Sequence, residues 1–250
     1  MLDVEYERRA QQEVEHWRAK MLQQPGMLSW AAGRVQEKMN SYIPEKAHAA
    51  ITAIIKQMTQ GVLTGSEFVA PAPLLEGSLV VRERLVMQKV ETYRTTAAVE
   101  GGIAGAGGFV LGLVDFPVLF SIKLKLLFDV AALYGYSCAD FRERLYLLQI
   151  FQLAFSSQQH RRKIFQEIEH WQGRAEGLPN SLDDFDWRTY QQEYRNYIDL
   201  AKLVQLIPIV GAPVGAVVNY RLLKQLGETA RNAYRLRWFS HQASQPLAIK

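Results

Sequence analysis

Two short stretches of this 250-residue chain repeat the same pair of chemically useful side chains. Glu13 and His16 lie in Gln-Glu-Val-Glu-His-Trp at 12–17, and Glu167 and His170 lie in Gln-Glu-Ile-Glu-His-Trp at 166–171. In a helix, Glu-x-x-His puts a carboxylate and an imidazole on one face, and two such helices with two further glutamates can hold a di-iron or di-manganese centre. Both stretches are strongly polar, whereas a metal site in a bundle core has apolar neighbours. We therefore favour solvated side chains here and expect no metal or cofactor.

Two carboxylates flank a glycine-rich run and form the second candidate. Glu100 precedes the run and Asp115 follows it. A carboxylate beside an apolar, water-poor segment has its charged form disfavoured, which suits the acid or base of a hydrolase. Asp115 is also a good helix N-cap with Pro117 in the first turn, and Asp129 can pair with Lys125 one turn before it. Capping and pairing are the favoured interpretation of these residues.

Other catalytic signatures are absent from the sequence. It contains no Gly-x-Ser-x-Gly nucleophile elbow and no His-Glu-x-x-His zinc motif. The glycine run lacks the Gly-Lys-Ser/Thr ending of a phosphate-binding loop, and no strand is predicted before it. The single cysteine, Cys138, excludes an internal disulfide and indicates a reducing compartment.

The composition favours one substantial helical domain. Hydrophobic residues make up 48% of the chain, enough at this length for a large core. Nearly every segment has helical periodicity, which predicts a mainly α, single multi-helix domain without a substantial sheet. We divide it into a polar N-terminal helix at 1–26, a helical domain at 27–242 and a tail at 243–250.

Charge and the N-terminal sequence limit the expected location and partners. The net charge of +4 is too small to predict nucleic acid as a partner. The first residues are charged and lack the apolar core of a secretory signal, so we expect a cytoplasmic protein.

Glycine, proline and capping residues set the predicted helix ends. Helices are predicted at about 3–23, 28–42, 44–61, from 78 into the glycine run, 115–135, 137–155 and 158–175, with two or three more after 187. Asp115-Phe116-Pro117 predicts a break before a new helix that ends at Gly135. Ser137-x-x-Asp140 resembles a capping box that opens the following helix.

The glycine-rich run is the most unusual part of the chain, because residues 101–122 contain one charged side chain, that of Asp115. Glycines four residues apart share a helix face and let two backbones approach closely. A second run, LIPIVGAPVGAVV at 206–218, has the same character. We predict that the two runs pair as an apolar hairpin, either buried in the core or inserted at a membrane surface, whereas the break at Asp115 argues against a clean spanning helix. The residues assigned to this hairpin are Gly101, Gly105, Gly108, Gly112, Pro117, Tyr134, Gly135, Pro208, Gly211, Gly215 and Asn219.

The C-terminal segment carries a local basic bias, since no acidic residue follows Glu228. Basic and aromatic side chains together favour an anionic membrane interface, and a solvated terminal helix is the alternative. The residues assigned to this membrane surface are Arg231, Arg235, Arg237, Trp238 and Phe239.

These motifs together resemble the EcsC protein family of bacterial proteins. The resemblance rests on Gly101-Gly102 through Gly112, Asp115-x-Pro117, Ala131-x-x-Tyr134-Gly135-Tyr136, and Ile207-Pro208-x-x-Gly211-Ala212 followed by Asn219. It covers roughly residues 30–240. The family is named for a member encoded beside an ABC-transporter ATPase and its membrane subunit, so the resemblance implies a transporter neighbourhood. It implies no catalytic residues.

Two functional hypotheses follow. The favoured one is a non-enzymatic, cytoplasmic accessory protein at the inner face of the plasma membrane, with an anionic membrane surface and a transporter or protease as its partners. The alternative is an enzyme, either a hydrolase that uses Glu100 or Asp115, or a di-metal protein that uses the two Glu-x-x-His pairs.

Overall fold

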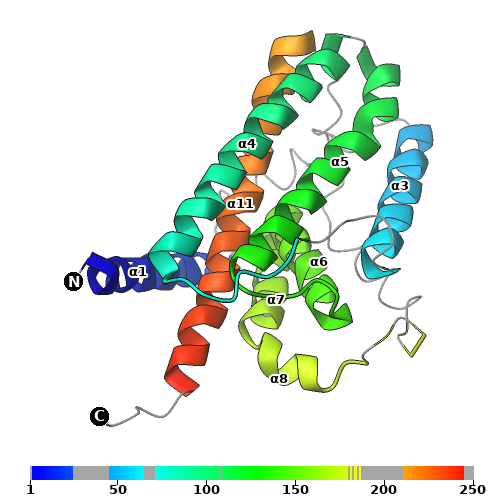
Figure 1. Ribbon diagram of the computed structural model, residues 1–250. Helices are drawn as coiled ribbons and strands as arrows, with labels where there is room; N and C mark the ends of the chain where they lie inside the picture. The colour runs from blue at the N-terminus through cyan, green and yellow to red at the C-terminus, as the bar shows by residue number, and fades with distance from the viewer. Residues whose placement is uncertain are drawn as a thin grey trace, which may run out of the picture.

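A computed structural model describes residues 2–24, 45–64, 71–106, 108–179, 181, 183–184, 186 and 211–244 (Figure 1). Within these ranges the chain folds into α-helices without a strand, which confirms the predicted mainly α class. The helices are α1 (Leu2–Leu22), α3 (Glu45–Thr64), α4 (Leu79–Ala106), α5 (Gly108–Leu133), α6 (Phe141–Phe155), α7 (Gln158–Glu169), α8 (Trp171–Glu176) and α11 (Gly211–Ser244). The predicted helix at 28–42 and the segment 187–210, with Pro208, lie outside the described residues.

Three long helices, α4, α5 and α11, lie side by side and form what we call the arm (Figure 1). Helix α4 rises to Ala106, and α5 descends from Gly108. Helix α11 starts at the same end of the arm, which we call the tip, and runs antiparallel to α4. Helices α1, α6 and α7 pack against the half of the arm opposite the tip, and α3 contacts α5 and α6.

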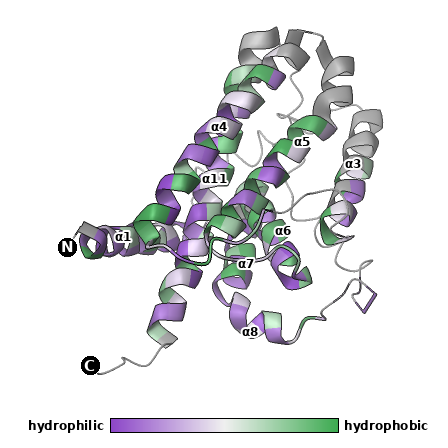
Figure 2. Ribbon diagram, in the orientation of Figure 1, coloured by the Kyte–Doolittle hydropathy of each residue, from purple (hydrophilic) through white to green (hydrophobic). Residues whose placement is uncertain are grey.

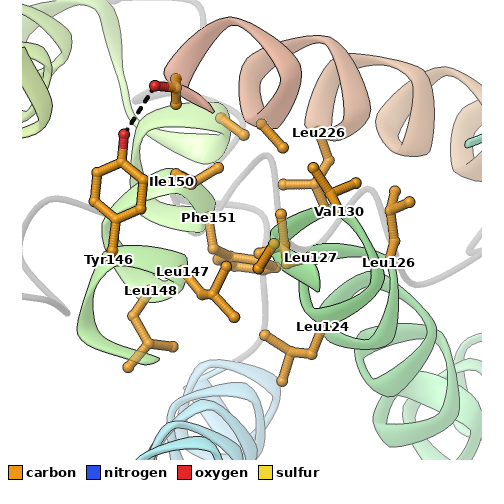
Figure 3. Close-up of a cluster of buried hydrophobic side chains, with 14 of the residues drawn as sticks. Leu124, Leu126, Leu127, Val130, Tyr146, Leu147, Leu148, Ile150, Phe151 and Leu226 are labelled. Atoms are coloured by element: carbon orange, nitrogen blue, oxygen red, sulfur yellow. Dashed lines mark hydrogen bonds between the residues drawn. The ribbon is translucent and has the colours of Figure 1, made fainter. Parts of the chain in front are cut away.

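The core of the molecule lies between α5, α6 and α11. Side chains from these helices meet there, including Leu127, Phe151 and Leu226, each with no exposed surface (Figure 3). Helix α6 is buried on nearly all sides, so it is the central helix of the body rather than an amphipathic surface helix. The hydroxyl of Tyr146 satisfies its hydrogen-bonding capacity there by donating to the backbone carbonyl of Ala233 at 3.0 Å.

The predicted break at Asp115 is wrong. Helix α5 continues from Gly108 to Leu133 with Pro117 inside it, so Asp115 does not cap a new helix. A proline inside a helix removes one backbone hydrogen bond and crowds the preceding turn. Leu119, Phe120 and Leu124, in the two turns after it, are completely buried, and this packing outweighs the local cost. The chain instead reverses where α4 ends and α5 begins.

Two further helix boundaries differ from prediction. Asp140, not Ser137, is the N-cap of α6, because its carboxylate accepts from the backbone N–H of Arg142 at 2.8 Å. The predicted helix at 158–175 is two helices, since α7 ends at Glu169 and α8 begins at Trp171. The predicted stop at Gly135 is close to the observed end of α5, and Gly135 has φ +93°, which favours glycine.

Candidate functional site

An unusual polar contact joins α5 and α11 just after the two apolar runs. The ammonium group of Lys123 in α5 donates to the Leu119 carbonyl oxygen one turn earlier and to Oδ1 of Asn219 in α11, both at 3.1 Å. Lys123 has no exposed surface, and no carboxylate among the described residues pairs with it. Burial lowers the pKa of Lys123 to about 7. This lysine is therefore a buried base held by neutral oxygens, between α5 and α11.

A second buried cation, Arg235 of α11, is surrounded by acids and phenols. Its guanidinium binds both carboxylate oxygens of Glu83 in α4 at 2.6 Å, and also Glu13 of α1 at 2.7 Å. Glu83 accepts two more hydrogen bonds, from Tyr6 at 2.7 Å and Tyr134 at 3.0 Å. Burial alone would lower the pKa of Arg235, but the bonds to Glu83 and Glu13 outweigh it and raise that pKa. The cluster joins α1, α4, α5 and α11 through charged hydrogen bonds.

A third cation, Arg237, occupies an aromatic pocket next to this cluster. It pairs with Glu143 of α6 at 2.8 Å and lies over the Tyr136 ring, 3.6 Å from the centroid. The hydroxyl of Tyr234 donates to the same carboxylate at 2.5 Å, and its ring packs edge-on against Tyr146. Burial raises the pKa of Tyr234 well above its usual value, so the phenol stays protonated as a donor.

These contacts correct the predicted membrane surface at the C-terminal end. Arg235 is 2% exposed, and the side chain of Arg237 is 12% exposed. Arg231 is half-buried, and Trp238 and Phe239 pack against the core. Acidic side chains distant in sequence pair with Arg235 and Arg237, so these two cations are not free to face a membrane.

Of the two carboxylates proposed for hydrolysis, the structure describes the side chain of Glu100, which is not part of these clusters. Glu100 is half-buried on α4, and the side chain of Asp115 lies outside the described residues, so their catalytic role stays a prediction. The predicted pair of Lys125 and Asp129 is confirmed at 2.9 Å. Asp129 also accepts from Lys89 and Tyr93, both at 3.0 Å. Burial would raise the pKa of Asp129, but these hydrogen bonds outweigh it and hold the pKa below its usual value.

The repeated Glu-x-x-His motif lies on two helices that pack together, α1 and α7, but its side chains serve other contacts. Glu13 pairs with Arg235, and Glu167 pairs with Arg174 at 2.9 Å. His16 and His170 are exposed. Across the described ranges, no group of three or more His, Cys, Asp or Glu side chains could hold a metal ion. The structure therefore gives the di-metal hypothesis no support.

The predicted glycines lie in helices at the tip end of the arm: Gly101 and Gly105 in α4, Gly108 and Gly112 in α5, and Gly211 and Gly215 at the start of α11. A close contact between α4 and α11 involves a glycine that the sequence did not single out. A Cβ on Gly227 of α11 would lie 2.6 Å from a methyl group of Val90 in α4. An isolated glycine in a long helical segment was the available signal for this contact.

Two other groups with reactive chemistry are buried. Burial raises the pKa of the Cys138 thiol to about 12, so it is not a thiolate nucleophile at neutral pH. Lys123 is a base without an exposed surface. No helix among the described residues has the length and apolar character needed to cross a membrane.

Comparison with known proteins places these features in a family. A sequence model of the EcsC protein family matches residues 8–239, which include most of α1. Protein EcsC of Bacillus subtilis (strain 168) is 41% identical over 235 residues, covering 94% of this chain and 97% of that protein. The uncharacterized protein YdbA of the same organism is 24% identical over 214 residues, or 85% of this chain and 79% of its own length. No solved structure matches. The match over nearly the whole length shows that the chain belongs to the EcsC protein family.

Proposed function

We propose that the protein is a non-enzymatic accessory protein that works at the membrane and contacts it with the tip of the arm. The observation that carries the proposal is a set of exposed apolar side chains near the tip. Val99 of α4, Val118 of α5 and Val217 of α11 are 57%, 49% and 48% exposed. All three lie within about three helical turns of the tip.

The sequence around these residues extends the apolar character. Residues 101–122 carry one charge, and the described residues nearest the tip on α4 and α5 are mostly apolar (Figure 2). Exposed apolar side chains on adjacent elements are typical of surfaces that contact a membrane or a partner. Three helices with their ends at one level can enter the interfacial region of a bilayer without crossing it. The family resemblance implies a transporter neighbourhood. We therefore propose the membrane subunit of a transporter as the protein partner.

The chemistry of the buried groups supports a non-enzymatic role. Arg235 and Arg237 are held by carboxylates, and the Cys138 thiol is protonated at neutral pH. These groups stabilise the fold and present no free nucleophile.

Vesicle flotation tests the membrane contact. We expect the wild-type protein to float with vesicles of phosphatidylglycerol and phosphatidylcholine, and Val118→Asp to weaken this binding by about tenfold or more, because a charge replaces an apolar contact. Val81→Asp is the matched control, since Val81 lies at the opposite end of α4 and is 44% exposed. Absence of flotation at low salt, or an equal loss in both variants, contradicts the proposal.

A further inference from the structure

A pocket of about 400 Å³ lies where α1, α6, α7 and α11 meet, next to the Arg235 cluster, with which it shares Glu13. Its volume is in the range of small-molecule sites. Three cationic side chains line it from three helices: Lys20 of α1, Arg161 of α7 and Arg231 of α11. Apolar side chains, including Trp17 and Met21, form another part of the wall.

The two carboxylates in the wall of the pocket already have cationic partners. Glu13 pairs with Arg235 at 2.7 Å, and Glu228 pairs with Lys224 at 3.7 Å. Neither Arg235 nor Lys224 lines the pocket. These two negative charges are therefore partly neutralised from outside it.

The three cations that line the pocket have no such partners. Among the described residues, no carboxylate forms an ion pair with Lys20, Arg161 or Arg231. Nε of Arg231 is also buried without a hydrogen-bond acceptor. Buried polar groups in folded proteins normally have partners, so this donor is available to an acceptor.

Buried arginines elsewhere in the described residues fall into two groups. Nε of Arg94, Arg142 and Arg237 is, like that of Arg231, buried without an acceptor, whereas Arg82 and Arg144 bind backbone carbonyls. Arg82 donates to the backbone carbonyls of Leu74 and Leu133, at 2.6 Å and 2.9 Å. Arg144 donates to the carbonyls of Leu63 and Cys138, at 3.0 Å and 2.9 Å. Burial lowers the pKa of Arg161, with no carboxylate to offset this effect.

We propose that this pocket binds the phosphate group of a small, partly apolar ligand. Two guanidinium groups and an ammonium group match a phosphate dianion better than a carboxylate, which carries one charge and two oxygens. The apolar part of the ligand packs against Trp17 and Met21. This site is separate from the tip of the arm and does not rest on the proposed membrane contact.

Binding of phosphate compounds to the full chain tests the proposal. The probes are inorganic phosphate and glycerol phosphate, compared with chloride at equal ionic strength, and the readouts are the melting temperature and titration calorimetry. We expect both phosphate probes to raise the melting temperature of the wild type. Arg161→Gln removes a charge-assisted contact, so it should weaken phosphate binding by about tenfold or more.

Arg162→Gln is the matched control, because Arg162 is the next residue of α7, is exposed and does not line the pocket. It should bind the phosphate probes like the wild type. Among the described residues, no carboxylate pairs with the Arg161 side chain. Arg161→Gln should therefore be as stable as the wild type in chloride. Lys20→Gln is a second pocket variant and should also weaken binding. Equal phosphate binding by the wild type and both pocket variants overturns the proposal.

A parallel measurement with vesicles that contain phosphatidic acid distinguishes a soluble phosphate ligand from a lipid headgroup. Binding of soluble phosphates that depends on Arg161 identifies a soluble ligand. Vesicle binding that depends on Arg161, without soluble-phosphate binding, identifies a lipid headgroup. Absence of Arg161-dependent binding in both assays overturns the proposal.

Discussion

Two buried cations of the arm, Arg235 and Lys123, differ in how the fold compensates their charge. Arg235 has Glu83 and Glu13 as partners, and the phenols of Tyr6 and Tyr134 support Glu83. Lys123 has a backbone carbonyl and one amide oxygen. The pKa of Arg235 is raised, whereas burial lowers the pKa of Lys123 to about 7. Near α1, the arm is thus held by paired charges, whereas Lys123 is a buried base whose described partners are neutral oxygens.

The largest expected effect comes from removing the paired cation. Arg235→Met leaves the Glu83 carboxylate buried without a positive partner, so the free energy of unfolding should fall by about 3–5 kcal/mol. Urea denaturation measures this loss. The double variant Glu83→Gln, Arg235→Met should recover much of it, because no buried charge is then left alone. A loss below about 1 kcal/mol in the single variant contradicts this view of the cluster.

The unpaired cation should respond in the opposite direction. Lys123→Met removes a desolvated amine, so it should stabilise the protein by about 2–4 kcal/mol at pH 7. In the wild type, the unfolded chain binds a proton at Lys123 up to about pH 10.5, while the folded chain releases it above about pH 7. Wild-type stability should therefore rise with pH across this window.

Urea denaturation of the wild type and of Lys123→Met at pH 6, 7, 8 and 9 measures how the free energy of unfolding depends on pH through Lys123. The difference between them should be largest below pH 7 and shrink as the pH rises. A pH-independent difference, or a destabilised variant, shows instead that the lysine is charged and compensated when folded.

The contact of Gly227 with Val90 sets the spacing of α4 and α11, the two helices that the Glu83–Arg235 pair joins. Gly227→Ala should destabilise the protein by about 1–3 kcal/mol, because the added methyl group meets Val90 at 2.6 Å, despite the higher helix propensity of alanine. Thermal unfolding measures the effect. Val90→Ala, placed in the Gly227→Ala background, should restore stability by removing the clashing methyl groups. No loss in Gly227→Ala means that α4 and α11 can separate without cost.

The smallest expected effect tests the cap that precedes Glu143, the acid paired with Arg237. Asp140→Ala should cost about 1 kcal/mol, since the N–H of Arg142 loses its acceptor. Ser137→Ala is the control and should cost less, because its hydroxyl accepts a longer bond of 3.3 Å from Ala139. Chemical denaturation of both variants decides which residue caps α6.

Local sequence patterns predicted much of the fold. The 3.6-residue periodicity predicted α1, α3 and α4, and the end of α6 at Phe155. The same reasoning failed at Asp115-Phe116-Pro117, because local capping and proline rules cannot include the packing that carries α5 through Pro117. The candidate sites were harder to predict, since Lys20, Arg161 and Arg231 are distant in sequence and meet only where three helices converge.

The sequence alone determined the helical class, the apolar glycine-rich runs and the family, because periodicity, composition and motif order are encoded locally. Only the tertiary structure decided which charges are compensated. The basic C-terminal segment predicted a surface, yet Glu83 and Glu143 from other helices enclose Arg235 and Arg237. Among the described residues, Lys123 meets no such acid. Electrostatic compensation depends on distances between side chains across the fold, and sequence spacing does not set those distances.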